Sequence, residues 1–320
     1  MSEGWPGVEL RHFAALRAVA AECSFHGAAR RLGYTQSAVS QQIAALERAV
    51  GARLVVRPGG PNPVALTEAG ELLVRHAEGI AARVATAQAD FAAYLAGSRG
   101  LLRIGVYQSV GAKIMPDLLR QFAQQRPDVR VELMEQPSDI VLIDALEAGA
   151  IDLAFVDLPV PERPFETVQL LRDQYVLVVQ AGSPLAARKR PPALEELGHL
   201  PLLAFRSGRC MTRILRQLAD EGINPRIALR CDDNGTLQGL AGAGMGVALM
   251  PSLAVDFDDP RIVAIDVGEL VPARVIGLAW HRDRQHMPLA ASFVEFTTKL
   301  YRESSGPEAL KGLPTELVRT

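Results

Sequence analysis

The stretch TQSAVSQQIAALERAVG, residues 35–51, combines a regular apolar stripe with an unusual polar face. Its apolar residues recur at intervals of four, three and four, the spacing that lines one face of an α-helix: Val39, Ile43, Leu46 and Val50. The opposite face carries Gln36, Ser37, Ser40, Gln41 and Arg48. A helix that only has to be soluble more often presents Glu and Lys. We therefore interpret residues 35–51 as a helix whose outer face is suited to hydrogen bonding.

Two further helices are expected before this one. The first runs from about Val8 to Cys23. The second is the short segment HGAARRL, residues 26–32, with Ser24 as its N-cap and Gly33 as a terminal residue that tolerates positive φ. Thr35 is a good N-cap for the third helix. The sequence thus predicts three helices, the last two joined by a very tight turn.

The segment that follows, RLVVRPGGPNPVALT, predicts a small hairpin, or wing, over residues 53–67. Charge is distributed unevenly around it. From residue 24 to residue 66 there are five arginines and one acid, a local net charge of +4, so the remainder of the chain carries about −6. This asymmetry suits a small module that meets a polyanion and is attached to a larger body that does not. The alternative is a chance cluster of solvated arginines.

Length and composition indicate a folded protein of two or three domains. The chain has 320 residues, of which 48% are hydrophobic and 22% charged. Its apolar runs are short, and its N-terminus lacks the pattern of a signal peptide, so a cytoplasmic location is expected. Cys23, Cys210 and Cys231 show neither CxxC nor Cys/His spacing. We therefore expect no disulfide scaffold, no metal site and no cofactor.

A long helix is predicted after the wing, with Thr67 as its cap. It carries a heptad-like seam of about three repeats: Leu73, Ala77, Ile80, Val84, Ala87, Phe91 and Tyr94 or Leu95. We interpret this seam as the contact of a homodimer. The alternative is a helix that lies on the core of its own domain. Gly97, Ser98 and Gly100 are expected to form a hinge.

Beyond the hinge, strand-like and helix-like segments alternate, which predicts parallel α/β sheets with crossover connections. About 200 residues are too many for one sheet. The proline-rich segment VDLPVPERPF, residues 156–165, is interpreted as the crossing between two lobes. A final strand and helix, residues 273–281 and 288–302, are expected to return to the first lobe.

The motifs of the N-terminal module resemble a known family. AARRLGYTQSAVSQQIAALERAVGARLVVR, followed by LTEAG, resembles the winged helix-turn-helix of the LysR-type transcriptional regulators. The segments LRIGV, LEAGAIDLAFVD and LAGAGMGVALMPS resemble the two-lobed, periplasmic-binding-protein-like effector domain of that family. The resemblance implies a regulator that binds promoter DNA as a dimer or dimer of dimers and responds to a small molecule held between the lobes.

Domain boundaries follow from this reading. We expect an all-α winged helix-turn-helix at residues 1–66, a linker and dimerisation helix at 67–97, an α/β effector-binding domain at 98–303 and a tail at 304–320. Lobe I would comprise residues 101–162 and 267–303, and lobe II residues 163–266.

The resemblance also implies which residues meet DNA. Gln36, Ser37 and Ser40 would face bases, with Thr35 and Gln41 nearer the backbone. The arginines expected near phosphates or the minor groove are Arg30, Arg31, Arg53 and Arg57. Two departures weaken the expected role of the wing: Val55 stands where the family usually has Phe, and the loop PGGPNP contains no basic residue.

Effector residues are expected where strands end, because ligands of two-lobed α/β domains sit in the crevice at the carboxyl ends of strands. Three loops occupy such ends and match family effector positions: Gln108, Ser109 and Val110; Gln136, Pro137 and Ser138; Phe205, Arg206, Ser207, Arg209 and Cys210. For Ser138, helix capping is an equal alternative. Arg206, Arg209, Arg213 and Lys113 indicate a carboxylate-bearing effector, with a solvated arginine face as the equal alternative.

Cys210 raises the possibility of redox sensing. GRCMTR, residues 208–213, resembles the GHCLRD segment around the reactive cysteine of the peroxide-sensing branch of the family. A thiol at a helix N-terminus beside arginines would have its thiolate favoured. The partner cysteine expected nine residues later is Ala219 here, and Cys231 is the only other candidate. An ordinary buried or ligand-lining cysteine is the favoured interpretation.

Other functional classes fit less well. GAGMG, residues 242–246, is preceded by a helix and followed by a strand, the reverse of a dinucleotide fingerprint. A solute-binding transport protein would explain the α/β body but not the basic module. The sequence contains no nucleophile elbow, phosphate loop or metal-ligand cluster, so an enzyme is not expected.

Overall fold

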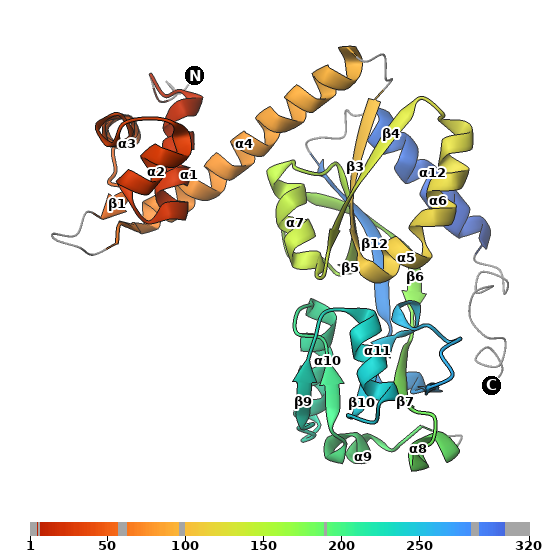
Figure 1. Cartoon of the computed structure of the whole chain (residues 1–320). Helices are drawn as coiled ribbons and strands as arrows, with labels where there is room; N and C mark the ends of the chain where they lie inside the picture. Colours follow the sequence, from red (N-terminus) through yellow and green to blue (C-terminus); the bar gives the residue numbers. More distant parts are fainter. Residues whose placement is uncertain are drawn as a thin grey trace. The chain divides into compact units, whose positions relative to one another are not determined.

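The computed structural model describes residues 5, 7–56, 63–95, 100–188, 191–282 and 288–304, which form two compact units (Figure 1). The N-terminal unit contains the helices α1 (Leu10–Glu22), α2 (Phe25–Leu32) and α3 (Gln36–Val50). The antiparallel strands β1 (Val55–Val56) and β2 (Ala65–Leu66) form the wing, and the long helix α4 (Glu68–Leu95) follows. The predicted winged helix-turn-helix with a linker helix is confirmed.

Local interactions explain the tight turn between α2 and α3. Ser24 Oγ accepts a hydrogen bond from Gly27 N at 3.3 Å, and Thr35 Oγ1 accepts one from Ala38 N at 3.2 Å, so both predicted N-caps are present. Gly33 has a φ of 70°, which glycine adopts without the steric penalty of a β-carbon. The apolar residues predicted to face inward, Val39, Ile43 and Leu46, are fully buried in the core of this unit.

Hydrogen bonds and close packing hold the wing to the helices. Glu47 Oε1 accepts from Leu54 N at 2.8 Å and from Val55 N at 3.3 Å, so this acid is structural. A β-carbon on Gly70 would lie 2.0 Å from Leu54 O, which explains the glycine of LTEAG. The hairpin tip, including Arg57 and the loop PGGPNP, lies outside the described residues.

The second unit contains two five-stranded sheets. The lobe I sheet has the order β4-β3-β5-β12-β6. Its strands are β3 (Gly100–Tyr107), β4 (Val129–Gln136), β5 (Leu153–Leu158), β6 (Phe165–Asp173) and β12 (Arg274–His281). The helices of this lobe are α5 (Gln108–Lys113), α6 (Met115–Gln125), α7 (Asp139–Ala148) and α12 (Pro288–Ser304). Phe122, Phe155 and Phe293 lie at the centre of its core.

The lobe II sheet has the order β11-β7-β10-β8-β9. Its strands are β7 (Tyr175–Gln180), β8 (Leu202–Ala204), β9 (Ile227–Arg230), β10 (Val247–Pro251) and β11 (Ile262–Asp266). The helices are α8 (Pro184–Ala187), α9 (Leu194–His199), α10 (Arg209–Asp220) and α11 (Asn234–Gly242), with 3₁₀ turns η1 (Ser252–Ala254) and η2 (Gly268–Leu270). The two-lobed α/β fold is confirmed.

Three details of the sequence prediction are wrong. Both sheets are mixed: β3 pairs in parallel with β4 and β5, but β12 runs antiparallel to β5 and β6, and β7 runs antiparallel to β10 and β11. Strands β6 and β11 were not predicted. Finally, residues 165–173 pair with β12 in lobe I, so the chain crosses between lobes after Asp173 and not within residues 156–165.

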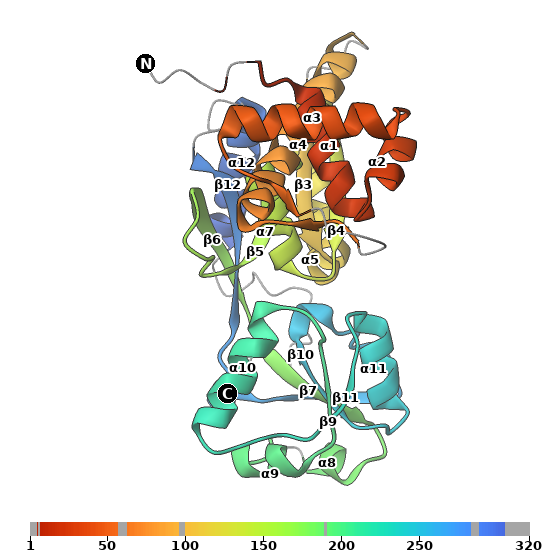
Figure 2. The ribbon, with the colours of Figure 1, turned by 90° about the vertical axis from the view of Figure 1, so that its left-hand side faces the viewer.

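Strand β6 was not predicted because buried, half-buried and exposed residues are mixed along it at the edge of its sheet. Such a strand has no continuous apolar run to reveal it. Figures 1 and 2 both show that β6 and β12 approach lobe II side by side. Gly100 is the first residue of β3, while Gly97, Ser98 and residues 305–320 of the expected tail lie outside the described residues.

Gly244 and Gly246 of the GAGMG segment have structural roles. Gly244 follows α11 with a φ of 78°. A β-carbon on Gly246 would lie 2.4 Å from Pro201 O, so this glycine lets β10 approach the neighbouring backbone.

Candidate DNA interface and interlobe site

The outer face of α3 presents polar side chains from a rigid helix. Gln36, Ser37 and Gln41 are exposed, and Ser40 is half-buried beside them. The Thr35 hydroxyl is occupied locally, because it caps α3 and lies 3.0 Å from Ser37 Oγ. The face therefore offers amides and hydroxyls, which can pair with base edges in a major groove.

The arginines of the module differ in their surroundings. Arg30 and Arg31 are both exposed in the last turn of α2, but Arg31 Nη1 lies 3.2 Å from Glu22 Oε1. Arg53 is exposed just before the wing. Arg48 Nε donates to Ala44 O at 3.2 Å. Arg57 falls outside the described residues.

In the second unit, Gln108 bridges the two lobes. Gln108 Nε2 donates to Asp233 Oδ2 at 2.9 Å, and Asn234 N donates to Gln108 Oε1 at 2.9 Å. The pKa of Asp233 is lowered because the Gln108 amide and Thr236 donate hydrogen bonds to its carboxylate. Gln108 begins α5 in lobe I, whereas Asp233 caps α11 in lobe II.

Of the neighbouring predicted residues, Ser109 takes part in a buried ion-pair network and Val110 belongs to the lobe I core. Arg274 Nη2 donates to Ser109 Oγ at 2.8 Å, and Arg274 Nε donates to Asp173 Oδ2 at 2.7 Å. Asp173 is the last residue of β6 and Arg274 the first of β12, so this pair joins the two strands that connect the lobes. Ser252 Oγ of lobe II also donates to Asp173 Oδ1, at 2.7 Å.

The second predicted loop contributes little to the interlobe surface. Ser138 is buried, and its Oγ accepts from Ile140 N at 3.2 Å, as a capping residue would. Gln136 is half-buried at the end of β4, and Pro137 is exposed.

The third predicted loop, residues 205–210, is fixed by lobe II itself before it reaches lobe I. Ser207 N and Oγ donate to the two carboxylate oxygens of Asp232 at 2.7 and 3.0 Å. Phe205 O accepts from Arg230 Nη1 at 3.1 Å, and the exposed Arg206 donates to Arg230 O at 3.4 Å. The loop is thereby held so that the next residues begin α10.

The first two turns of α10 hold lobe I. Arg209 Nη2 lies 2.5 Å from Asp139 Oδ2, Arg209 Nη1 donates to Pro159 O at 2.6 Å, and Arg209 Nη2 also donates to Asp157 O. Asp157 Oδ2 accepts from Cys210 Sγ at 2.7 Å and from Arg213 Nη2 at 3.0 Å. We call this set of contacts, formed by Arg209, Cys210 and Arg213 on Asp139 and Asp157, the interlobe grip.

The environment of Cys210 does not favour a thiolate. Burial, together with the charge and hydrogen bond of Asp157, raises the pKa of the Cys210 thiol to about 12, although Arg274 and Tyr175 act in the opposite direction. The Sγ–H group is thus a hydrogen-bond donor to a carboxylate. A protonated thiol is a poor nucleophile, so the position at a helix N-terminus does not make this cysteine reactive.

Sequence reasoning placed the arginines of the site but missed the acids that they bind. Asp139, Asp157 and Asp173 are each at most 5% exposed, and Arg274 is 8% exposed. These acids lie at the ends of strands or beside a predicted loop, which was the available signal. Because Arg209 and Arg213 are paired with them, the interpretation of these arginines as a free anion-binding surface loses its basis. Lys113 is exposed at the end of α5.

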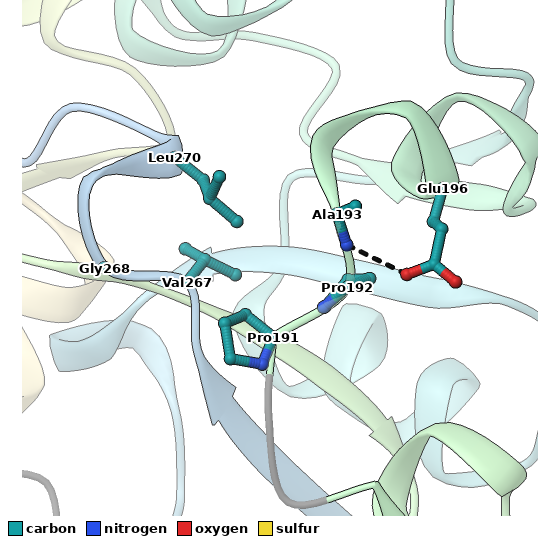
Figure 3. Close-up of a pocket in the computed structure, with 7 residues that line it drawn as sticks. All are labelled: Pro191, Pro192, Ala193, Glu196, Val267, Gly268 and Leu270. Atoms are coloured by element: carbon teal, nitrogen blue, oxygen red, sulfur yellow. Dashed lines mark hydrogen bonds between the residues drawn. The ribbon is translucent and has the colours of Figure 1, made fainter.

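A separate open pocket of about 610 Å³ lies in lobe II (Figure 3). It is lined by Pro191, Pro192, Ala193, Glu196, Val267, Gly268 and Leu270. Figure 3 shows Glu196 accepting a hydrogen bond from Ala193 N, at 2.9 Å, so its carboxylate is used in capping α9. None of the predicted effector residues lines this pocket.

Within the described ranges, no group of three or more His, Cys, Asp or Glu side chains is arranged to hold a metal ion. Nor does any described helix combine the length and apolar character needed to cross a membrane.

Two family models match the chain and together span nearly all of it. Residues 10–71 match the bacterial regulatory helix-turn-helix protein, lysR family. Residues 95–302, well over half of the chain, match the LysR substrate binding domain. The chain belongs to the LysR family of transcriptional regulators.

Relatives of this LysR-family regulator are named for different signals. A "Probable hydrogen peroxide-inducible genes activator" of Mycobacterium avium is 31% identical, and the match covers 89% of this chain and 93% of the relative. A "Probable nitrogen assimilation transcriptional activator" of Synechococcus elongatus is 32% identical, covering 88% and 91%. The crystal structure of CbnR, a LysR family transcriptional regulator, is 25% identical with a TM-score of 0.66, covering 91% and 99%. The family is shared, whereas the signal differs among relatives.

Proposed function

We propose that this LysR-family regulator reads promoter DNA with the outer face of α3. The observation that carries the proposal is the exposed row of Gln36, Ser37 and Gln41, with Ser40 beside it, on a helix whose other face is fully buried. Gln can pair with adenine, and Ser can donate or accept at several base edges. Thr35 would contact the DNA backbone.

Arginines around α3 would supply the contacts to phosphate. Arg30 and Arg53 are exposed and form no ion pair within the described part of the chain, and Arg31 would leave Glu22 or share it. Arg57 is proposed as a further contact from its place in the sequence. Each neutralised phosphate steepens the salt dependence of binding by about 0.9 in the log-log slope.

We infer that α4 joins two copies of the chain. The helix has 28 residues, too long to be stabilised by the small N-terminal core alone, and it carries the heptad-like seam. A dimer would place two α3 helices on one operator, and two dimers would form the proposed dimer of dimers.

The interlobe site is proposed to hold the small-molecule effector. Residues from both lobes meet there: Gln108 and Ser109 from lobe I, and Arg209 and Cys210 from lobe II. The lobes are connected by only two strands at Asp173 and Arg274, so a ligand that alters the contacts between them would alter their angle. That change would modulate DNA binding or bending.

Binding of a fluorescent fragment of the protein's own promoter tests the DNA-reading face. Ser40→Arg places a long side chain between Gln36 and the groove, and we expect the anisotropy change at the wild-type half-saturation concentration to disappear. Gln124→Arg adds the same charge to exposed helix α6 and should bind like the wild type. Retained affinity in a folded Ser40→Arg protein would show that α3 does not read the promoter.

A further inference from the structure

Two buried polar atoms of the interlobe site have no hydrogen-bond partner among the described residues. Asp157 Oδ1 and the Tyr107 hydroxyl make no hydrogen bond, although Asp157 is 3% and Tyr107 7% exposed. Among the described residues five buried side-chain atoms share this state, and the others belong to Gln42 in α3 and to Thr297 and Thr298 in α12. Buried polar atoms without partners are costly, so a group that bonds them would be favoured there.

Asp157 contacts lobe II directly, and Tyr107 lies beside Arg274, where the two connecting strands meet. Asp157 Oδ2 is bonded by Cys210 and Arg213 of α10, so the same carboxylate turns its other oxygen away from those donors. The guanidinium of Arg274 lies 5.0 Å from the centre of the Tyr107 ring. Burial raises the pKa of Tyr107 well above its usual value, although the charge of Arg274 lowers it, and the carboxylates of Asp173 and Asp157 add to the rise.

The charges of the interlobe grip favour a donor over an acceptor. Arg209 and Arg213 already neutralise Asp139 and Asp157. A carboxylate ligand would have to draw these guanidinium groups away and leave two buried acids without partners, which is strongly unfavourable. A ligand with N–H donors could bond Asp157 Oδ1 directly, or replace Arg213 at Oδ2 with a group of the same chemistry.

We propose that Asp157 determines effector specificity, and that the interlobe site takes a small organic molecule presenting an N–H donor group, such as an amidinium, guanidinium or amide. In this arrangement the donor nitrogen bonds Asp157 Oδ1, and the Tyr107 hydroxyl bonds a second polar atom of the ligand. The inference rests on the proposed function, in which the interlobe site holds the effector.

Three nearly isosteric probes test whether the interlobe site prefers ligands with N–H donor groups. Benzamidine offers cationic N–H donors, benzamide a neutral N–H donor, and benzoate only acceptors. With full-length protein, we expect the melting temperature to rise most with benzamidine, less with benzamide and not with benzoate. In Asp157→Asn, the dissociation constant of benzamidine from titration should rise by about tenfold or more, because a charge-assisted hydrogen bond is lost.

A second variant tests the proposal if Asp157→Asn does not fold. Tyr107→Phe removes only a hydroxyl that has no protein partner, so the fold should be retained, and benzamidine binding should weaken several-fold. Thr297→Val is the matched control, because it removes another buried hydroxyl without a partner from α12, a helix that packs against α6. This control should bind benzamidine like the wild type.

The outcomes distinguish the proposed class of ligand from the proposed interlobe location of the effector. If benzoate stabilises the wild type most, and Arg209→Ala abolishes the effect, the site holds ligands but the proposed class is wrong. If the wild type, Asp157→Asn and Tyr107→Phe respond alike to all three probes, both the class and the interlobe location of the effector are overturned. Promoter binding by the same preparations tests the DNA-binding part of the function independently.

Discussion

Cys210 is a hydrogen-bond donor whose acceptor, Asp157, comes from the other lobe. With a pKa of about 12, only about one thiol in ten thousand is ionised at pH 8. We therefore expect iodoacetamide at pH 8 to label the exposed Cys23 at least about a hundred times faster than Cys210, as followed by mass spectrometry of the peptides. Comparable rates at the two cysteines would contradict the protonated thiol.

The same geometry predicts how Asp157 controls that thiol. Asp157→Asn removes a negative charge and an ionised acceptor, so the pKa of Cys210 should fall and its labelling should accelerate. A peroxide sensor would lose its response in Cys210→Ser, whereas we expect the transcriptional response to peroxide to be the same in that variant and the wild type. A response lost in Cys210→Ser would instead show that this regulator shares the signal named for the peroxide activator among its relatives.

The Asp173–Arg274 pair carries a stability prediction, because both partners are buried where the two connecting strands meet. Arg274→Ala leaves a buried carboxylate without its cation, a loss of about 3–5 kcal/mol. Calorimetry should show the effector unit melting about 10 °C lower. Arg120→Ala breaks an exposed pair with Asp117, worth about 0–1 kcal/mol, and should change the melting temperature little. Equal shifts in the two variants would show that burial does not strengthen the Arg274 contact.

Sequence reasoning reached some residues of the site and missed others for a physical reason. Ser24, Thr35 and Gly33 were predictable because capping and positive φ depend on neighbours in the chain. Asp157 and Asp173 were not, because their partners lie 53 and 101 residues away in sequence. Arg209 and Arg213 appeared free in the sequence because the acids that they bind lie in elements distant along the chain.

At the scale of elements, α2 and its arginines should determine part of the salt dependence. Arg30→Ala should reduce the log-log salt slope of promoter binding by about 0.9 per subunit if Arg30 neutralises one phosphate. Glu22→Gln releases Arg31 from its ion pair and should strengthen binding at low salt. Anisotropy titrations over a series of salt concentrations measure both effects. An unchanged slope in Arg30→Ala would remove this residue from the interface.

Helix α4 carries the prediction of dimerisation. Val84→Glu puts a charge on the heptad-like seam and should shift the protein to monomer in sedimentation velocity at micromolar concentration. Ala85→Glu introduces the same side chain at the next position, which is exposed and outside the seam, and should sediment as the wild type does. A dimeric Val84→Glu protein would assign dimerisation to another surface.

Elements differed in how clearly the sequence revealed them. Helices α2 and α3 carry caps, periodicity and a terminal glycine, so all their signals agree. Strands β6 and β11 lie at the edges of their sheets, and their residues range from buried to exposed. Antiparallel pairing of β12 with β5 and β6 depends on strands more than a hundred residues apart, and no local pattern encodes it.

At the scale of the molecule, a basic helix-turn-helix module and a two-lobed domain explain the uneven charge of the chain. The overall charge of −2 is the sum of a positive module and a negative remainder, and the positive module is evident when the charge is counted along the sequence. The fold and the family could be predicted from motifs in the sequence. The contacts within the interlobe site could not, because contacts between lobes depend on how the two sheets are joined.

Hydroxyl-radical footprinting of the wild-type protein on its own promoter tests the central claim most directly, that paired α3 helices read a specific operator. We expect two protected half-sites related by two-fold symmetry, with centres about 10 base pairs or a multiple apart, and no comparable protection on unrelated DNA of the same length. Uniform protection of both DNAs, or a single unpaired half-site, would contradict the account.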